Sequence, residues 1–568
     1  MSGDIQIRLR LPEQDLGALT LGSDQPRRLR AWVAQLPRMN LGETARQLYL
    51  YIQELNRLPL ETPTRLQLLE ILRPPLLETC ASLGQHYLKQ SLVLPENAQR
   101  VAALAQALQN HLATGYKLVV SRALRRVQRL QSSGQAGQGA AERALQRNVA
   151  TAMQRAASAL SEVLLRSCQL YLPTPRHLWL ELHQLYLLAS TYALEHVQIT
   201  DPAWPGTEQV TTVANTYHRA LLLATARPNQ LRQPELAWVF EASAQWAGMI
   251  QVRPANADDD LFVFDLQLDK PPTCRTHVSA ARASSRYVHS RALVEALAAS
   301  EAGHAPSGFE LPAGGPPALL AHLCQAWGAV AERSFQRQVH TLQLDICLGI
   351  SAVHFHASGS VDFVARTQQA ASSEAAMEAI DLATASAAAK GGRQRAVSFP
   401  AHRCQTVNVS PGGYCLAWQG ETPPQLRTGE LIGLREEEHH EWTVGLVRWV
   451  RQLTHQGAQL GVELLAPRVL AVAARVLPPA GEAGDFQRVL LLPELDTIGQ
   501  PATLLLPPLG FAPGCIVELL RQGARERVQL ARRVSSTASI MQYEFQSLDA
   551  APAASGDADE FHSIWASL

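Results

Sequence analysis

Apolar residues return at every third or fourth position from about residue 25 to residue 246, with few β-branched runs between them. This spacing is the period of one face of an α-helix. We therefore expect an α-helical, bundle-like domain over residues 1–248. The individual helices are expected over residues 98–131, 140–172, 175–195, 208–226 and 234–246, preceded by shorter helices.

Local signals refine the first of these helices. Asn40 followed by Glu43 resembles a capping box, so a helix should begin directly after Asn40. Pro63 suits the first turn of the next helix, whereas Pro74 and Pro75 should end it, because neither proline can donate a backbone hydrogen bond. No repeat period of helical-repeat length is evident, which favours a bundle over a solenoid.

The pattern changes over residues 249–331, which we interpret as a mixed transition region with a connecting helix. Residues 261–268 alternate between apolar and polar positions as a strand does. Residues 316–338 return to helical spacing and end at an arginine pair, Arg333 and Arg337. This helix should lead directly into a β domain.

Short strand-like runs separated by turn residues dominate the rest of the chain, which predicts an α+β multidomain protein. Residues 332–476 should form a small antiparallel β-barrel, with one or two strands over 341–357 and an alanine- and serine-rich loop or loose helix inserted at about 367–392. Its further strands are expected over residues 404–409, 414–418, 431–434, 442–450 and 459–465.

Residues 486–546 show the same pattern of short strand-like runs separated by turn residues and should form a second small β domain. Its strands are expected over residues 489–492, 502–506, 515–520, 527–534 and 540–545. Residues 549–568 are rich in small and polar residues and should be a disordered tail, whose apolar tip at 561–568 could dock on a partner.

Composition bounds the function classes. A chain of 568 residues is too long for one core and should hold about three or four domains. The formal net charge is +0, so no global field would attract a nucleic acid polymer or an anionic membrane. Eight scattered cysteines without a C-x-x-C pair fit a reducing cytoplasm, and we expect neither a signal peptide nor a membrane span.

Two short motifs carry the candidate chemistry. Arg333 and Arg337 stand four residues apart, and a guanidinium fork can bond a phosphate bidentately or match guanine O6 and N7. In the second motif Asn408 offers an amide for a base edge, Ser410 offers a hydroxyl for phosphate, and Gly413 leaves room for close backbone approach. Either motif alone could be a solvated helix face or a tight turn, so the argument rests on their conjunction and order.

In that order the two motifs resemble the PilZ domain family. The family pattern is R-x-x-x-R, a first strand, and then [D/N]-x-S-x-x-G on the second strand of a small antiparallel barrel. The sequence continues as family members do, with similar runs at residues 429–432, 442–449 and 460–464. The resemblance implies cyclic-di-GMP as ligand and Arg333, Arg337, Asn408, Ser410 and Gly413 as the residues that bind it.

The chain departs from the family pattern in two ways. The insertion separates the two motifs by more residues than is usual, although the entropy of closing such a loop grows only with the logarithm of its length. The residue before the pair is Glu332, where many members carry another arginine, so ligand affinity and stoichiometry stay open. An alternative register would take Arg393, Arg395 or Arg403 as the basic partners.

Other signals are weaker. Residues 436–441 hold two adjacent histidines among glutamates, and His354 with His356 would share one strand face, but neither group supplies a full metal-ligand pattern. We interpret them as a charged hairpin turn and ordinary strand residues, and expect no metal. Phosphate-loop, nucleophile-elbow and dinucleotide-binding motifs are absent from the sequence, so we do not expect an enzyme.

The sequence therefore favours a cytoplasmic bacterial cyclic-di-GMP effector. Ligand binding would order the segment around Arg333 and Arg337 and change how the helical and β halves are arranged, with an unidentified protein partner contacted through the helical domain or the C-terminal tail. By resemblance, the process would be motility, surface appendages, secretion or biofilm control. The alternatives are a degenerate PilZ adaptor that binds no nucleotide and a helical chaperone-like or assembly factor whose barrels only mediate dimerisation.

Overall fold

A computed structural model describes most of the chain, and the chain divides into two compact units. The first comprises Met1–Arg333, Gly420–Pro424 and Val450–Ala458, and the second comprises Ser334–Gln419, Gln425–Trp449 and Gln459–Leu568. The described residues are 9–132, 140–205, 209–254, 260–278, 281–304, 306, 309–329, 337–364, 367, 399–436, 441–453, 457–478, 484–494, 500–521 and 523–549.

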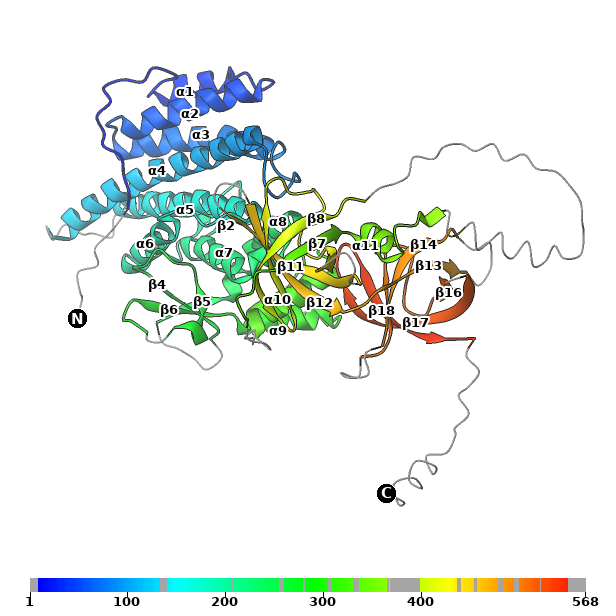
Figure 1. Cartoon of the computed structure of the whole chain (residues 1–568). Coiled ribbons are helices and arrows are strands. Elements are labelled where there is room, and N and C mark those ends of the chain that lie inside the picture. The colour runs from blue at the N-terminus through cyan, green and yellow to red at the C-terminus, as the bar shows by residue number, and fades with distance from the viewer. Residues whose placement is uncertain are drawn as a thin grey trace, which may run out of the picture. The chain divides into compact units, whose positions relative to one another are not determined.

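The first unit is mainly helical, as the apolar spacing predicted (Figure 1). The two longest helices, α4 and α5, lie side by side, and the Asn40 side chain caps α2 by accepting a hydrogen bond from the Glu43 N–H at 3.1 Å. The helix bounds are α1 (Pro26–Ala34), α2 (Leu41–Arg57), α3 (Thr62–Gly84), α4 (Glu96–Ser132), α5 (Ala140–Gln169), α6 (Leu178–Thr191), α7 (Val213–Thr225) and α8 (Gln233–Trp246). A short pair of strands, β1 (Ile199–Thr200) and β2 (Val210–Thr211), precedes α7.

Helix α3 does not end at Pro74 and Pro75, contrary to the prediction; it continues to Gly84. A proline inside a helix costs about 3 kcal/mol because it removes a backbone hydrogen bond. Tertiary packing opposes that cost here, since Leu72 and Leu76 on either side of the proline pair are fully buried. Burial of this turn explains why the helix persists through it.

A buried network of charges adjoins the same turn. The Arg73 guanidinium donates to both carboxylate oxygens of Asp201, at 2.7 and 3.0 Å. Arg155 on α5 lies 3.1 Å from Asp201 and 3.2 Å from Glu70 on α3. Although burial raises the pKa of Asp201, the charges of Arg73 and Arg155 outweigh it and hold that pKa below its ordinary value. One carboxylate thus ties α3, α5 and the turn after β1 together.

The transition region adds a small sheet and two helices to the first unit. The strand order is β3-β6-β4-β5, and β4 lies within the strand-like run at residues 261–268, although three of its four residues in succession are buried and do not alternate. Helices α9 and α10 follow and contact each other. The bounds are β3 (Gln251–Arg253), β4 (Phe262–Asp265), β5 (Thr273–Cys274), β6 (Ser285–His289), α9 (Arg291–Glu301) and α10 (Pro317–Gly328).

The predicted helix over 316–338 is too long. Helix α10 ends at Gly328, after which Ala329 is extended, and Gln338 takes part in a β-bridge with Val409. Glycine is a poor helix former, and the backbone of Gln338 has a partner strand to bond. Residues 330–336, including Arg333, lie outside the described residues.

The second unit contains two closed barrels, which confirms the predicted β architecture. The first has the strand order β10-β11-β12-β9-β8-β7. Its strands are β7 (Gln343–Leu348), β8 (His402–Ser410), β9 (Gly413–Gln419), β10 (Leu431–Arg435), β11 (Thr443–Leu453) and β12 (Gly457–Ala466). The insertion expected at 367–392 lies outside the described residues except for Thr367.

Residues 350–357 form a helix, α11 (Ile350–Ala357), where the sequence predicted a strand up to Ala357. Gly349 has a φ of +86°, which turns the chain after its N–H has donated to Leu431 O at 2.8 Å. His354 and His356 therefore do not share a strand face. Each instead lies within hydrogen-bond distance of a backbone carbonyl, that of Val472 or of Phe399, at 3.1 Å.

The second barrel has the order β13-β14-β15-β18-β17-β16. Its first strand, β13, pairs with β14 and β16, so residues 470–477 belong to this barrel. The boundary expected from the sequence, at residue 476, had placed most of this strand in the preceding barrel. The bounds are β13 (Leu470–Leu477), β14 (Gln487–Leu492), β15 (Thr503–Leu506), β16 (Ile516–Arg521), β17 (Ala524–Ser536) and β18 (Met541–Ser547). The tail after Asp549 lies outside the described residues.

One apolar cluster is common to both barrels, in addition to a separate cluster inside the second barrel, which the sequence did not suggest. Val353 of α11 and Leu431 of β10 belong to the same buried cluster as Leu490 of β14 and Ile540 before β18. Helix α11 contacts strands of both barrels. Polar contacts close the same seam, with Thr537 Oγ1 donating to Gly429 O and Ser539 Oγ to the Glu430 carboxylate, each at 2.8 Å. Apolar and polar contacts therefore join the two barrels.

None of the described helices combines the length and the apolar character that crossing a membrane requires.

We predict that the shared core transmits a change in one barrel to the other. Ile540→Ala removes a fully buried side chain from the second barrel, at a cost of about 2 to 5 kcal/mol. Hydrogen exchange measured by mass spectrometry should then accelerate in peptides covering β10 of the first barrel, because its Leu431 contacts the same cluster. The exposed Val534→Ala is the matched control and should leave these rates unchanged. Acceleration confined to the second barrel would contradict a common core.

We also predict that the helical unit loses stability in mild acid. His183 and His218 are buried, and burial lowers the pKa of each to about 4 from an ordinary 6.5. The unfolded chain therefore binds more protons between pH 6.5 and 4, so stability is lost as pH falls through that window, by at most about 3 kcal/mol for each histidine.

Thermal unfolding at pH 7, 6 and 5 tests this prediction. The midpoint of the helical transition should fall with pH, and His183→Asn should flatten that dependence even though it lowers stability at pH 7. The exposed His304→Asn serves as control and should retain the dependence of the unsubstituted chain. A midpoint that does not change from pH 7 to 5 would refute the assignment.

Candidate functional site

The second motif lies on the hairpin formed by β8 and β9. Ser410 pairs with Gly413 across a tight turn at residues 411–412, and Asn408 pairs with Cys415. A bulge between Thr406 and Asn408 shifts the register, so two residues of β8 oppose one of β9. Residues that pair across two strands point to the same side of the sheet, so Asn408 lies on the same face as Ser410. Thr406 lies on the opposite face, although it is also two residues away from Asn408, because the bulge lies between them.

The chain that follows the arginine pair is hydrogen-bonded to this motif. The Gln338 N–H donates to Val409 O and the Val409 N–H donates to Gln338 O, both at 2.9 Å. Val409 stands between Asn408 and Ser410, so the residue after Arg337 is held directly beside the motif. Two segments far apart in the sequence thus meet at one edge of β8.

Electrostatics place the Arg337 side chain near the same face. Burial raises the pKa of Cys415, and the positive charge of Arg337 acts on that thiol in the opposite direction. Cys415 is the residue directly across from Asn408. Arg337 itself is exposed, so its guanidinium is accessible to a solute, whereas Asn408 and Ser410 are half-buried.

Thr406 fixes the approach of this segment, a role that sequence reasoning missed. The Leu342 N–H donates to Thr406 Oγ1 at 2.7 Å, and the Thr406 hydroxyl donates to His340 O. Thr406 is almost fully buried. The alternating polar residues Thr406, Asn408 and Ser410 were a possible signal, but the bulge that separates their roles is not visible in that alternation.

Gly413 is explained by packing inside the barrel. A Cβ atom at Gly413 would lie 1.9 Å from Val462 O of β12, and its φ is +155°. The neighbouring strand therefore occupies the space beside Gly413 that we expected a ligand to approach. Ser410 Oγ donates to Gly413 O at 3.1 Å, so the glycine also orients the serine. Its part in ligand binding stays a prediction.

One carboxylate adjoins the motif. The Tyr414 side chain, next to Gly413, is hydrogen-bonded to Glu436. Burial raises the pKa of Tyr414, and the nearby charge of Glu436 raises it further. Tyr414 is therefore protonated at neutral pH and can donate its hydroxyl proton to Glu436.

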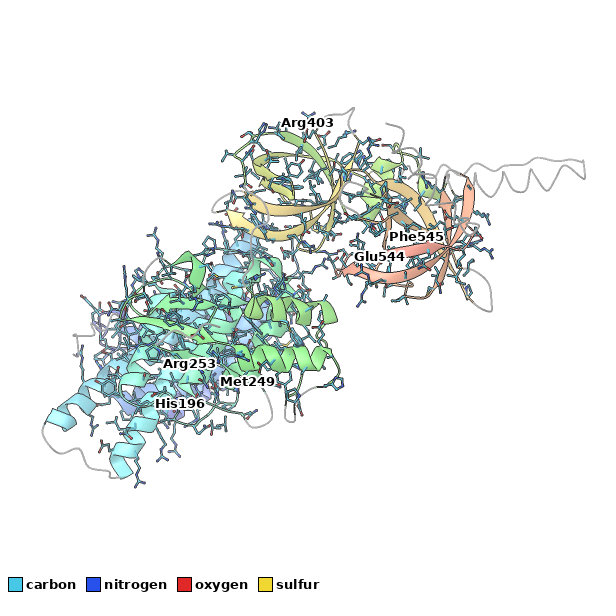
Figure 2. All side chains as sticks on the ribbon, turned by 90° about the horizontal axis from the view of Figure 1, so that it is seen from below. His196, Met249, Arg253, Arg403, Glu544 and Phe545 are labelled. Carbon is cyan, nitrogen blue, oxygen red and sulfur yellow. The ribbon has the colours of Figure 1, made fainter. Side chains whose placement is uncertain are left out.

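The alternative register finds no support where it can be examined. Arg393 and Arg395 lie outside the described residues, as do Glu332 and Arg333. Arg403, labelled on the outer side of the barrel in Figure 2, lies 3.6 Å from Asp345. It stands five residues from Asn408 along β8, which corresponds to about 17 Å of strand. The structure thus brings Arg337, Asn408 and Ser410 together, and does not bring Arg403 to them.

Comparisons with known proteins agree with this architecture. Three family profiles match in order: "Cyclic-di-GMP receptor FimW, N-terminal domain" over residues 27–256, "Cyclic-di-GMP receptor FimW, middle PilZ domain" over residues 261–395 and 367–470, and "FimW C-terminal beta-barrel domain" over residues 472–548. The boundary between the last two coincides with the start of β13.

A curated relative covers the whole length. The cyclic-di-GMP receptor FimW of Pseudomonas aeruginosa (strain PAO1) is 35% identical, and the alignment covers 99% of this chain and 99% of the relative. No solved structure matches the chain. The helical domain, which the sequence left without a family, is the FimW N-terminal domain. With its three domains in this order, the chain belongs to the FimW family of cyclic-di-GMP receptors.

Proposed function

We propose that this chain is a cyclic-di-GMP effector that binds its ligand through Arg333, Arg337, Asn408 and Ser410, with Gly413 holding the hairpin that presents the serine. The observation that carries the proposal is the pair of backbone hydrogen bonds between Gln338 and Val409. They keep the backbone at Arg337 beside Asn408 and Ser410. A contact that the fold itself makes between the two motifs would lower the entropy cost of binding.

The chemistry of these groups suits a cyclic dinucleotide. Arg337 can bond a phosphate bidentately or stack on a guanine, and its exposure leaves the guanidinium available for either. Ser410 can donate its hydroxyl to a phosphate oxygen in place of Gly413 O, and Asn408 can pair with a base edge. Arg333 would supply the second guanidinium. None of these roles transforms the ligand, so the activity proposed is binding and not catalysis.

Binding at this position would act on the connection between the two units. The first unit ends at Arg333 and the second begins at Ser334, so the arginine pair spans the boundary. A ligand that engages both arginines and β8 would change the arrangements that this connection allows. The output would be contact with a protein partner through the helical domain or the C-terminal tail, in the cytoplasm, in motility, surface appendage, secretion or biofilm control.

Isothermal titration with cyclic-di-GMP tests the binding step. Arg337→Ala and Ser410→Ala should each weaken binding, the arginine by at least tenfold, because a hydrogen bond to a charged group contributes about 1.5 to 3 kcal/mol. Arg403→Ala is the matched control on the same strand as Ser410 and should bind as the unsubstituted chain does. Absence of binding heat, or affinities indifferent to both substitutions, would favour the alternative of a PilZ adaptor that binds no nucleotide.

The coupling step has a separate readout. In the full chain, saturating cyclic-di-GMP should change the distance distribution between one spin label on α2 and another on β17, measured by pulsed electron resonance. Arg337→Ala should abolish the change, whereas Arg403→Ala should preserve it. A distribution identical with and without ligand, in a chain that binds the ligand, would leave the receptor in place but contradict the proposed rearrangement.

A further inference from the structure

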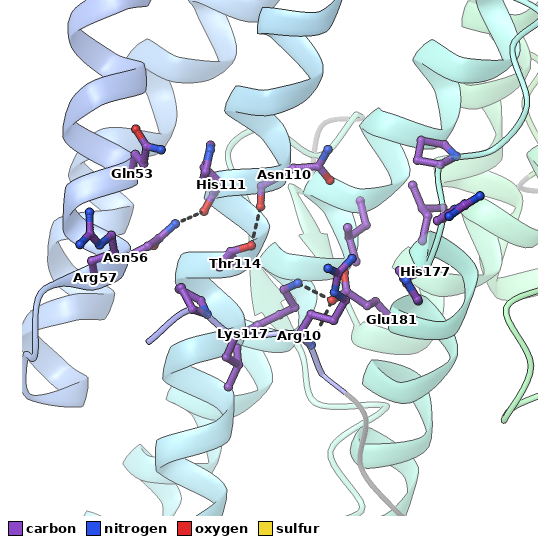
Figure 3. A pocket seen from close by; sticks show the side chains of 16 residues that line it. Arg10, Gln53, Asn56, Arg57, Asn110, His111, Thr114, Lys117, His177 and Glu181 are labelled. Carbon is purple, nitrogen blue, oxygen red and sulfur yellow. Dashed lines mark hydrogen bonds and ion pairs between the residues drawn. The ribbon is translucent and has the colours of Figure 1, made fainter. Parts of the chain in front are cut away.

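A pocket in the first unit lies apart from the PilZ barrel. It has a volume of 510 Å³ and is bounded by α2, α4, α5, α6, the segment around Arg10 and the loop that leads into α6 (Figure 3). This volume falls within the range that small-molecule sites occupy. The surrounding helices belong to one compact unit, so the walls of the pocket are fixed by the helical core.

The lining carries more positive than negative charge. Four cationic side chains, Arg10, Arg57, Lys117 and Arg176, line the pocket, against one carboxylate, Glu181. Arg57 pairs with Asp15 at 2.8 Å, a residue that does not line the pocket. The excess charge therefore resides on the other three cations, of which Lys117 alone forms an ion pair with Glu181.

Lys117 and Glu181 form the base of this arrangement. Their side chains are buried, and Lys117 Nζ lies 2.6 Å from Glu181 Oε1. The backbone N–H of Arg10 donates to the same carboxylate oxygen at 3.3 Å, as Figure 3 shows. Burial lowers the pKa of Lys117, and the positive charge of Arg10 lowers it further, against the opposing effect of Glu181. The Arg10 side chain is thus close enough to repel Lys117.

The two outer arginines are available to a ligand. Arg10 and Arg176 are exposed. Within the described part of the chain, neither side chain has a recorded hydrogen bond or ion pair. The N-terminus of α6 is not the source of the attraction, because Asp269 already accepts hydrogen bonds from the N–H groups of His177 and Leu180. An anion beside Arg10 would offset the repulsion between Arg10 and Lys117.

Neutral donors complete the lining. Gln53 and Asn110 contribute amides to the wall opposite α6, and His111 contributes a ring whose pKa is lowered by burial. His111 is therefore neutral at pH 7 and offers one donor and one acceptor nitrogen. Such groups suit the hydroxyls and ring edges of an organic ligand, in addition to its anionic group.

We infer that this pocket binds a small molecule that carries a phosphate group, with the phosphate held between Arg10 and Arg176 and the remainder against α2 and α4. Two unpaired guanidinium forks match the oxygens of a phosphate more closely than those of a carboxylate, because a phosphate can accept a bidentate pair from each. The volume suits a molecule of mononucleotide size and not the extended surface that a protein partner needs. Any such site would be independent of Arg337 and Ser410.

The test uses the full chain carrying Arg337→Ala, so that the proposed PilZ site does not contribute. Titration with GMP, with cyclic-di-GMP and with inorganic phosphate as competitor should reveal saturable binding that Arg10→Ala combined with Arg176→Ala weakens at least tenfold. Arg28→Ala combined with Arg30→Ala, two exposed arginines of α1 outside the pocket, is the matched control and should change nothing. Lys117 is left in place, since its removal would leave the buried Glu181 carboxylate without its ion-pair partner.

Two results would overturn the inference. The first is the absence of saturable binding by all three phosphate compounds, or binding that the double substitution leaves unchanged. The second is equal competition by malonate, a dicarboxylate, which would show that any anion is accepted; we expect malonate to compete at least tenfold more weakly than phosphate. A failure of the proposed function gives a different result from a failure of this inference. If the proposed PilZ site is wrong, Arg337→Ala alone will not reduce the affinity of the chain for cyclic-di-GMP.

Discussion

Two backbone hydrogen bonds between Gln338 and Val409 hold the chain around Arg337 beside Asn408 and Ser410, and the proposed nucleotide site depends on them. The arginine pair and the serine motif are separated in sequence by β7, α11 and the insertion. Without a fixed contact, the entropy of joining these segments would have to be met by the ligand alone. The bridge meets that cost when the barrel folds, so that Arg337 is already beside Asn408 and Ser410.

Several contacts within the barrel hold this arrangement in place. Thr406 anchors the chain between Arg337 and β7, the bulge turns Asn408 to the face that Ser410 shares, and the close approach of Val462 requires glycine at position 413. The second barrel then supports the first through the core around Val353 and Ile540. The C-terminal barrel therefore supports the PilZ domain structurally.

The sequence predicted the elements more accurately than it predicted their ends. Helix α10 was expected to reach Gln338, but it ends at Gly328, because the backbone of Gln338 bonds to β8 and not to a helix. Helix α3 was expected to stop at Pro74, but burial of Leu72 and Leu76 holds it together. Residues 350–357 were expected as a strand and form α11. In each case a tertiary contact outweighed a local preference.

By itself the sequence determined the helical first half, the two β domains, and the order of the motifs that indicated a PilZ domain, because hydrophobic period and motif order are properties of the linear chain. Only the tertiary structure decided that the chain at Arg337 lies beside Asn408 and Ser410, that one apolar cluster is common to the two barrels, and that cationic side chains from separate segments of the chain line one pocket. Those features depend on contacts between residues far apart in the chain. A local sequence pattern does not indicate which distant segment will pack against a given strand edge or helix face.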